Sequence, residues 1–424
     1  MNKQVIRNDT IGVEYVKIDH PSGLSILLCP MQGYSQAYAL FGTNYGSIDT
    51  CFKTDRDDHF VEIPDGVAHF LEHKMFENEE GDAFALYAET GASANAFTSF
   101  DRTCYLFSCT DKFEQSLRIL LDFVSRPYFT KETVQKEQGI IGQEIRMYED
   151  DPDWRVMFNL LGALYHEHPV KRDIAGTVES IAEIDADLLY RCHRTFYNLN
   201  NMVLAIAGNF ETDTVLRLCD EMLKPGEDIR IEKKAVDEPA EIVQKKCEQK
   251  LAVSIPLFCI GFKEKPVQEG ETVQTKVLAD ILLDVLAGES SPLYRELYDK
   301  GLINAQFGTE AFIGRGYFTN MFEGESKDPD AVFDAIVKQA ALYQREGLPR
   351  EAFERAKKAM YGRAVAQFHN VESVALSMVS SQFQKTGLFD VVEAAASVTY
   401  DAAQAFFKEH FNGARCALSV VLPA

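Results

Sequence analysis

Apolar and polar positions follow two different periods along the first half of the chain, and each period predicts a different element. Compact apolar runs bounded by turn residues, typical of buried strands, occur at 23–31, 36–46 and 201–210. Apolar residues three or four positions apart, typical of amphipathic helices, occur at 66–76, 110–126 and 130–152. Small, β-branched and aromatic residues predict extended chain over 92–110. The first half therefore mixes strands and helices.

The second half repeats this order of elements. The pattern predicts a strand, a helix, a pair of extended segments and two long helices, at 252–262, 272–288, 302–326, 330–347 and 350–368. Both halves close with a helix ending in aromatic residues, a polar turn and an apolar strand. Setting Phe196 against Phe411 gives a repeat period of 215 residues. We therefore predict an α+β protein of two homologous domains, each a mixed or antiparallel sheet covered by helices.

The boundary between these domains is predicted from a change in composition. A chain of 424 residues is too long for one compact core. Residues 224–250 are polar, charged and interrupted by prolines, which is typical of an interdomain linker. The predicted domains are thus 1–223 and 251–424, with 224–250 joining them.

Charge and composition narrow the class of function. The net charge of −22 argues against a basic nucleic-acid surface, and it favours either plain solubility or an acidic region that attracts basic peptides. The chain shows no apolar run of about 18–20 residues, as a membrane span needs, and no apolar signal segment at its start. Its nine cysteines are scattered and form no C-x-x-C pair. These features predict a cytoplasmic protein without a disulfide framework, a membrane anchor or a nucleic-acid partner.

The segment GVAHFLEHKMFE, at 66–77, holds the strongest chemical signal. His69 and His73 are four residues apart, so on a helix both side chains can face one metal ion. Glu72 flanks the same face and can take a proton from a water on that metal. This H-x-x-E-H order is the inverted form of a familiar zinc peptidase motif. The alternative is an amphipathic helix with a solvated face that carries two histidines.

A catalytic zinc needs a third protein ligand, and the helix predicted over 130–152 offers candidates. Glu137 and Glu144 are seven residues apart, two turns, and therefore lie on one face. Glu144 follows His73 by 71 residues. A carboxylate on a partly buried helix needs a partner, and a metal ion would supply one. The alternative is that both glutamates are exposed to solvent.

Together these motifs resemble the M16 metallopeptidases, the family of pitrilysin, insulysin and mitochondrial processing peptidase. The resemblance extends to the segments SANAFTSFDRTCY, HPVKRDIAGTVESI and SPLYRELYDKGL, and it spans essentially the whole chain. It is strongest to bacterial members with two domains. It implies the metallohydrolase fold of mitochondrial processing peptidase, with the two domains arranged as a clamshell around a substrate chamber.

The resemblance also implies roles for single residues. It makes Zn²⁺ the cofactor, with ligands His69, His73 and Glu144. Glu72 is the implied general base, and Glu137 is an outer carboxylate that orients a ligand histidine. An edge strand would bind the peptide backbone by β-augmentation, through Ala94, Asn95, Ala96 and Phe97. The implied activity is an endopeptidase for peptides or short unfolded segments.

The second half departs from the family pattern. Family members place an arginine and a tyrosine about seven residues apart there, to contact substrate and the developing oxyanion. Tyr317 fits the tyrosine position, but Glu310 stands where the arginine is expected, and Arg315 has the wrong spacing. Tyr317 is either a substrate contact or an ordinary strand aromatic.

This departure leaves three hypotheses for the assembly. The chain acts as a homodimer or alone, or it is the zinc-bearing member of a heterodimer whose sister chain supplies the Arg/Tyr pair. The third is a non-catalytic assembly subunit of the same fold, which the intact zinc motif disfavours. A second histidine pair, His166 and His168, precedes a proline and is interpreted as a surface or capping feature.

Overall fold

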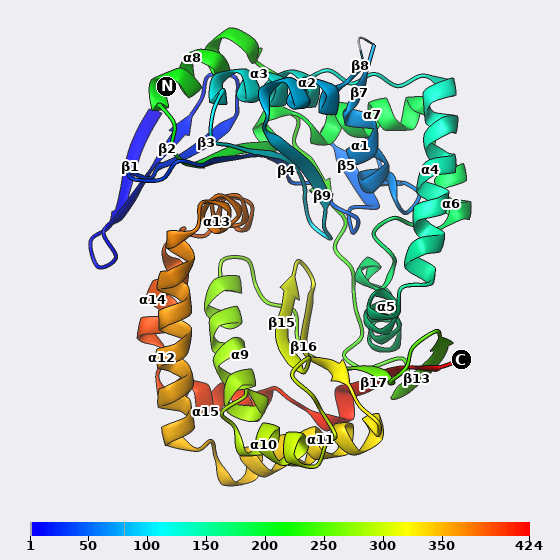
Figure 1. Cartoon of the computed structure of the whole chain (residues 1–424). Coiled ribbons are helices and arrows are strands. Elements are labelled where there is room, and N and C mark those ends of the chain that lie inside the picture. Colours follow the sequence, from blue (N-terminus) through cyan, green and yellow to red (C-terminus); the bar gives the residue numbers. More distant parts are fainter. Residues whose placement is uncertain (1, 80) are drawn as a thin grey trace. The chain divides into compact units, whose positions relative to one another are not determined.

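The computed structural model describes residues 2–79 and 81–424 and divides them into two compact units. Unit 1 comprises Met1–Ile145, Asp173–Lys234 and Val365–Leu388. Unit 2 comprises Arg146–Arg172, Ala235–Ala364 and Phe389–Ala424. Each contains sheets and helices (Figure 1), which confirms the predicted α+β class.

Unit 1 is built on a seven-stranded mixed sheet. In spatial order its strands are β1 (Asn2–Asn8), β2 (Val13–Asp19), β3 (Ser25–Pro30), β11 (Met202–Gly208), β4 (Ala37–Thr43), β10 (Thr103–Cys109) and β9 (Ser93–Thr98). Only the β3–β11 pair in this sheet is parallel. Strands β4 and β11 are buried along their whole length, and β9 lies at an edge of the sheet.

Smaller elements complete unit 1. A three-stranded sheet joins β12 (Ile231–Lys233), β5 (Cys51–Thr54) and β6 (Val61–Glu62), and a short hairpin joins β7 (Glu77–Asn78) and β8 (Gly81–Asp82). The helices are α1 (Val67–Met75), α2 (Ala83–Thr90), α3 (Phe113–Ser125), α4 (Lys131–Glu149, in unit 1 up to Ile145), α6 (Val178–Ala182), α7 (Ala186–Phe196), α8 (Thr212–Met222) and α13 (Val371–Gln384).

Unit 2 contains a five-stranded mixed sheet. Its spatial order is β13 (Lys246–Leu251), β17 (Cys416–Pro423), β14 (Leu257–Lys263), β16 (Tyr317–Glu325) and β15 (Gly308–Gly314), with only β13 and β17 parallel. Its helices are α5 (Pro152–Leu164), α9 (Thr272–Ala287), α10 (Pro292–Asp299), α11 (Pro329–Glu346), α12 (Arg350–Ala366, in unit 2 up to Ala364), α14 (Asp390–Ser397) and α15 (Tyr400–Glu409).

The two sheets share one topology, as a duplicated domain requires. The order β3-β11-β4-β10-β9 in unit 1 matches β13-β17-β14-β16-β15 in unit 2, including the parallel first pair. Phe196 and Phe411, which set the repeat period, are both buried. The segment 224–250 supplies β12 to the first unit and most of β13 to the second.

One helix of each sequence half packs on the sheet of the other half. Helix α5 comes from the first half but covers β14 and β17 in unit 2. Helix α13 comes from the second half but covers β4 and β11 in unit 1. Apolar side chains on one face of α13, including Val374, Met378 and Val379, are buried there. The compact units are therefore assembled from exchanged segments of the chain.

Two further features bear on the class of protein. In the part of the chain that the structure describes, no helix combines the length and apolar character that crossing a membrane requires. All nine cysteines are free thiols. Most are buried among apolar side chains, as expected for cysteines that serve as small core residues.

Candidate metal centre and active site

Helix α1 carries the H-x-x-E-H motif, and its first turn is held in place by a loop far along the chain. The preceding Gly66 has a φ of 91° and lies so close to the Ala175 carbonyl that an added Cβ would approach its oxygen to 2.4 Å. The Ser180 hydroxyl donates to the carbonyl of Asp65 at 2.9 Å. Only glycine satisfies both the left-handed backbone and the close approach. The segment HPVKRDIAGTVESI thus contributes to the docking of α1.

The side chains of His69, His73 and Glu144 come together at one point. One ligand atom from each lies within 4.8 Å of the others, and this is the one such group of three or more among residues 2–79 and 81–424. Nε2 of His69 lies 3.6 Å from Glu144 Oε1, and Nε2 of His73 lies 3.3 Å from Oε2. Donor atoms of a tetrahedral zinc with bonds of about 2.0–2.1 Å are about 3.3–3.4 Å apart. The two nitrogen–oxygen distances are therefore close to the spacing that such an ion requires.

Glu137 supports this group from behind His73. Its Oε1 lies 3.1 Å from Nδ1 of His73, and the Glu137 residue is only 8% exposed. Burial disfavours a charged imidazole, but the bonds to Glu137 and Glu144 outweigh it and raise the pKa of His73 to about 10. The same carboxylates favour a metal cation at this point, which would take the place of the proton. Two nitrogens and a carboxylate are a ligand set typical of zinc.

Glu72 lies beside His73 in the lining of one pocket and is hydrogen-bonded to strand β9. Its Oε2 accepts a hydrogen bond of 2.7 Å from the Thr98 hydroxyl. Strand β9 pairs only with β10 in the sheet order, so its outer edge is the edge of the sheet. Ala94, Asn95, Ala96 and Phe97 all lie on this strand, with Asn95 exposed. The predicted base and the predicted peptide-binding strand are thus neighbours.

A pocket of about 650 Å³ opens beside Glu72 and His73. One wall is aromatic, since the rings of Phe76 and Phe84 stack with centroids 4.3 Å apart. The rest of the lining is largely acidic or polar and comes from the β7–β8 hairpin, α4 and β9, with Glu77, Asn78, Glu79, Asp82, Asn95, Lys136 and Glu137 among its residues. Such a pocket suits a large apolar side chain, or a basic one that reaches the acidic rim.

Lys74, next to His73, was not among the residues predicted for the site. Its side chain is 0% exposed, and its ammonium group binds Glu77 at the start of the hairpin that lines the pocket. The spacing did contain a signal, because position 74 follows Phe70 by four residues and Leu71 by three. A lysine on the buried side of a helix needs an ionic partner, and Glu77 is close enough in sequence to provide it.

Tyr317 and its neighbours lie in unit 2. The tyrosine is only 4% exposed, and its ring packs on Phe312 and His168 with centroids 4.8 and 5.4 Å away. Glu310 is exposed on β15. Contact of Tyr317 with a substrate stays a prediction.

His168, of the second histidine pair, caps the short helical turn Pro169–Lys171, as a capping role predicts. His168 Nδ1 accepts from the backbone N–H of Val170, and its Nε2 lies 3.0 Å from the carbonyl oxygen of Arg315. The ring is therefore neutral, with the proton on Nε2. Burial lowers the pKa of His168 to about 4, in agreement with this assignment.

Comparisons with known proteins agree with the fold and with the family that the sequence resembles. The family model "Insulinase (Peptidase family M16)" matches residues 60–178, and the model "Peptidase M16 inactive domain" matches residues 183–360. The uncharacterized zinc protease YmfH of Bacillus subtilis is 40% identical over 407 residues, which cover 95% of each chain.

Two solved structures are also similar. An M16-like peptidase of Alicyclobacillus acidocaldarius superposes with a TM-score of 0.94 at 36% identity, over 99% of this chain and 100% of the other. Pitrilysin superposes with a TM-score of 0.77 at 15% identity, over 99% of this chain and 46% of its own, which is a likeness of fold alone.

Proposed function

Because this chain belongs to peptidase family M16, we propose that it is a zinc-dependent endopeptidase. The observation that carries the proposal is the convergence of His69, His73 and Glu144 within 4.8 Å. Glu72 lies beside a pocket, on the helix that also carries the two histidines. The relatives' description as zinc proteases supports zinc as the ion.

The residues divide into ligands, a base and a support. His69, His73 and Glu144 would hold the ion, and Glu137 would keep Nε2 of His73 aimed at it by accepting the proton on Nδ1. When bound, zinc supplies a Lewis acid and lowers the pKa of a water to about 7. Glu72 accepts the proton of the attacking water through the oxygen that Thr98 leaves free, and it later delivers that proton to the leaving amine.

An extended peptide is the substrate that these elements suit. The outer edge of β9 can hydrogen-bond a peptide backbone as an added strand, and this places the peptide next to Glu72. The pocket lined by Phe76 and Phe84 would take a substrate side chain. Most backbone groups of a folded domain are already hydrogen-bonded, so we expect peptides and unfolded segments to be cleaved. Enclosure in a chamber stays a prediction of the family resemblance.

The test separates chemistry from metal binding. We expect Glu72→Gln to retain zinc at one ion per chain but to lose hydrolysis of an unstructured peptide by at least about 100-fold, since the amide cannot accept the proton. We expect His73→Ala to lose zinc itself. Metal analysis and a fluorogenic peptide assay measure both. Wild-type cleavage by Glu72→Gln would rule out the assigned base.

A second candidate is a zinc-bearing chain that works only with a sister M16 chain. The burial of Tyr317 and the presence of Glu310 in unit 2 support it, because neither offers the Arg/Tyr pair expected there. The assay compares the purified chain alone with the chain plus a sister that carries the pair. A rate that rises only with the sister favours this candidate, and full activity of the chain alone eliminates it.

A further inference from the structure

We propose that Thr98 is a positioning residue for Glu72, and that a buried polar network behind it keeps the Thr98 hydroxyl in place. The inference rests on the proposed function, because it concerns the base of the same reaction. Its basis is one short hydrogen bond and the way the surrounding atoms restrict the proton of that bond.

The bond fixes which oxygen of Glu72 can act. Oγ1 of Thr98 lies 2.7 Å from Glu72 Oε2, a normal length for a hydroxyl donating to a carboxylate. A hydroxyl has a single proton, and an ionised carboxylate can only accept. The bonded oxygen is therefore engaged, and the opposite oxygen is the one available to the water. Without Thr98 the carboxylate could rotate and present either oxygen in several directions.

A second threonine leaves the Thr98 proton committed to Glu72. Thr103 faces Thr98 across the β9–β10 pair, with their hydroxyl oxygens 3.4 Å apart. The Thr103 hydroxyl donates to the carbonyl oxygen of Tyr45 at 2.9 Å, and its residue is fully buried. Since the Tyr45 carbonyl can only accept, the Thr103 proton points there. Thr103 can then only accept from Thr98, and at 3.4 Å it is a weaker acceptor than the charged carboxylate of Glu72 at 2.7 Å. The Thr98 proton is therefore directed to the carboxylate.

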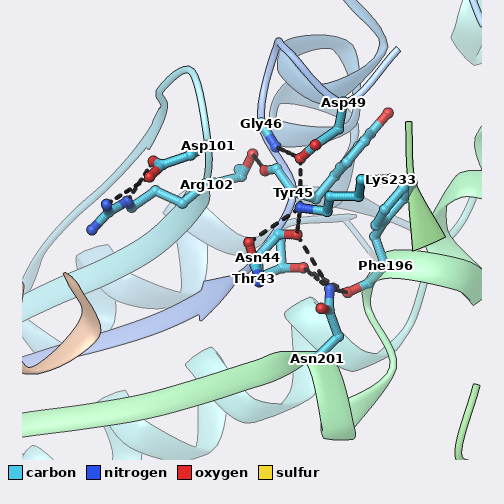
Figure 2. A network of polar contacts seen from close by, with 11 residues as sticks. Thr43, Asn44, Tyr45, Gly46, Asp49, Asp101, Arg102, Phe196, Asn201 and Lys233 are labelled. Atoms are coloured by element: carbon cyan, nitrogen blue, oxygen red, sulfur yellow. Dashed lines mark hydrogen bonds and ion pairs between the residues drawn. The ribbon is translucent and has the colours of Figure 1, made fainter. Parts of the chain in front are cut away.

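The loop that contains Tyr45 is held by a buried ion pair (Figure 2). Lys233 Nζ lies 2.8 Å from Asp49 Oδ2 and donates to the Asn44 carbonyl at 2.7 Å. The Asp49 side chain is 0% exposed and that of Lys233 is 15% exposed, so the pair is shielded from water. Asp49 also accepts the N–H of Gly46 at 3.0 Å. Breaking such a buried network is costly, so the loop is rigid.

The same loop packs directly on the turn that follows Thr98. A Cβ added to Gly46 would lie 2.5 Å from the backbone of Phe100, Asp101 and Arg102. The two backbones are therefore in direct contact, and only glycine fits between them. The N–H of Ser47 donates to the Ser99 carbonyl at 3.0 Å. The hairpin end that carries both threonines is thus fixed to the loop, and Thr98 offers Glu72 a stationary donor.

The hydroxyl of Thr98 is separable from the fold of the strand. Backbone pairing with β10 holds β9 in place. Valine has the same shape as threonine and an equally good strand propensity. Thr98→Val therefore removes the donor and leaves the strand, while Thr98→Ser restores a donor at the same atom.

The experiment uses the full zinc-loaded chain and an unstructured peptide. For Thr98→Val we expect kcat to fall about 10- to 100-fold, which is the range for losing a hydrogen bond to a charged group. KM, the zinc dissociation constant and the melting temperature are expected to match the wild type. Thr98→Ser is expected to recover kcat to within about 3-fold of the wild type, because serine keeps the donor.

A matched control is Thr90→Val at the end of α2, where the hydroxyl donates to the Tyr87 carbonyl and accepts from the Ala92 N–H but makes no bond to Glu72. We expect this variant to have wild-type kcat. The inference is overturned if Thr98→Val keeps wild-type kcat, if Thr98→Ser is no better than Thr98→Val, or if zinc content falls together with kcat. A wild-type chain that cleaves no peptide would instead count against the proposed function.

Discussion

Replacing Glu137 by glutamine tests whether the buried carboxylate behind His73 contributes to metal affinity. The substitution keeps the size of the side chain and removes its charge. Glu137 Oε1 lies 3.1 Å from His73 Nδ1, and the residue is 8% exposed, so little water is available to replace the lost charge. The amide oxygen can still accept from Nδ1, and the ring orientation is kept. What disappears is the charge assistance of that bond.

The size of the effect follows from the strengths of the two bonds. A hydrogen bond to a charged group contributes about 1.5–3 kcal/mol, and a neutral one about 0.5–1.5 kcal/mol. The difference, about 1–2 kcal/mol, corresponds to a zinc dissociation constant raised about 5- to 30-fold. This agrees with the range of about 10- to 100-fold found for outer-shell partners of metal ligands. At saturating zinc, kcat is expected to return close to the wild-type value.

The measurement is a competition for zinc between the protein and a chromophoric chelator at constant pH. Glu132→Gln is the matched control, since Glu132 lies on the same helix but is exposed in its first turn. We expect the control to leave the dissociation constant within about 2-fold of the wild type. Equal constants for all three proteins, or an equal shift in both variants, would refute the role given to Glu137.

Two further predictions concern the pocket and the stability of unit 2. Phe84→Ala removes the ring that stacks on Phe76 in the pocket. We expect kcat/KM for peptides with a large aromatic side chain to fall about 5-fold relative to kcat/KM for alanine-containing peptides. An equal loss of kcat/KM for both kinds of peptide would contradict the pocket assignment. Burial alone would raise the pKa of Glu238, but bonds from Lys263 and three backbone N–H groups lower it to about 2. The stability from this carboxylate, about 3 kcal/mol, is present above its unfolded pKa and is lost as pH falls toward 2. Urea unfolding should therefore give Glu238→Gln a lower free energy of unfolding than the wild type at pH 7, and a smaller difference between the two proteins at pH 3. An equal difference at both pH values would contradict this role of Glu238.

The metal group could be predicted because it depends on helix periodicity. His69 and His73 share a face for geometric reasons alone, and so do Glu137 and Glu144. Periodicity does not predict that these two helices contact each other. That prediction came from the resemblance to family M16, and the family matches over 60–178 and 183–360 confirm the resemblance. In the structure one ligand atom of each predicted ligand lies within 4.8 Å of the others, although Glu144 follows His73 by 71 residues.

The partners of these side chains were harder to foresee. The exchange of α5 and α13 between the sheets could not be predicted, because an amphipathic pattern shows that a helix covers a sheet but not which sheet. The bond from Thr98 to Glu72 joins two residues 26 positions apart through a strand register that no periodicity encodes. Lys74 was overlooked although its spacing placed it inside, since lysine is rarely buried.

The difference between the two units shows that the chemistry depends on a few side chains and not on the fold. Both sheets have an edge strand beside a helix, β9 beside α1 and β15 beside α9. In unit 1 the helix contributes Glu72, which accepts a hydrogen bond from the side-chain hydroxyl of Thr98 on the strand. In unit 2 the helix contributes Lys276, which donates to the backbone carbonyl of Ala311 on the edge strand itself at 2.9 Å.

This contrast has a consequence for where a peptide can add to a sheet. A backbone carbonyl already bonded to a lysine is a poorer partner for an incoming strand, because the new bond must compete with the existing one. Among the hydrogen bonds of the described residues 93–98, no lysine contacts the β9 backbone. The Ala96 N–H there donates to Oδ1 of the neighbouring Asn95 at 2.9 Å, and an incoming strand would have to displace only this side-chain amide. Peptide addition is therefore expected at β9, where the strand also positions the base, and the same topology in unit 2 is left to a supporting role.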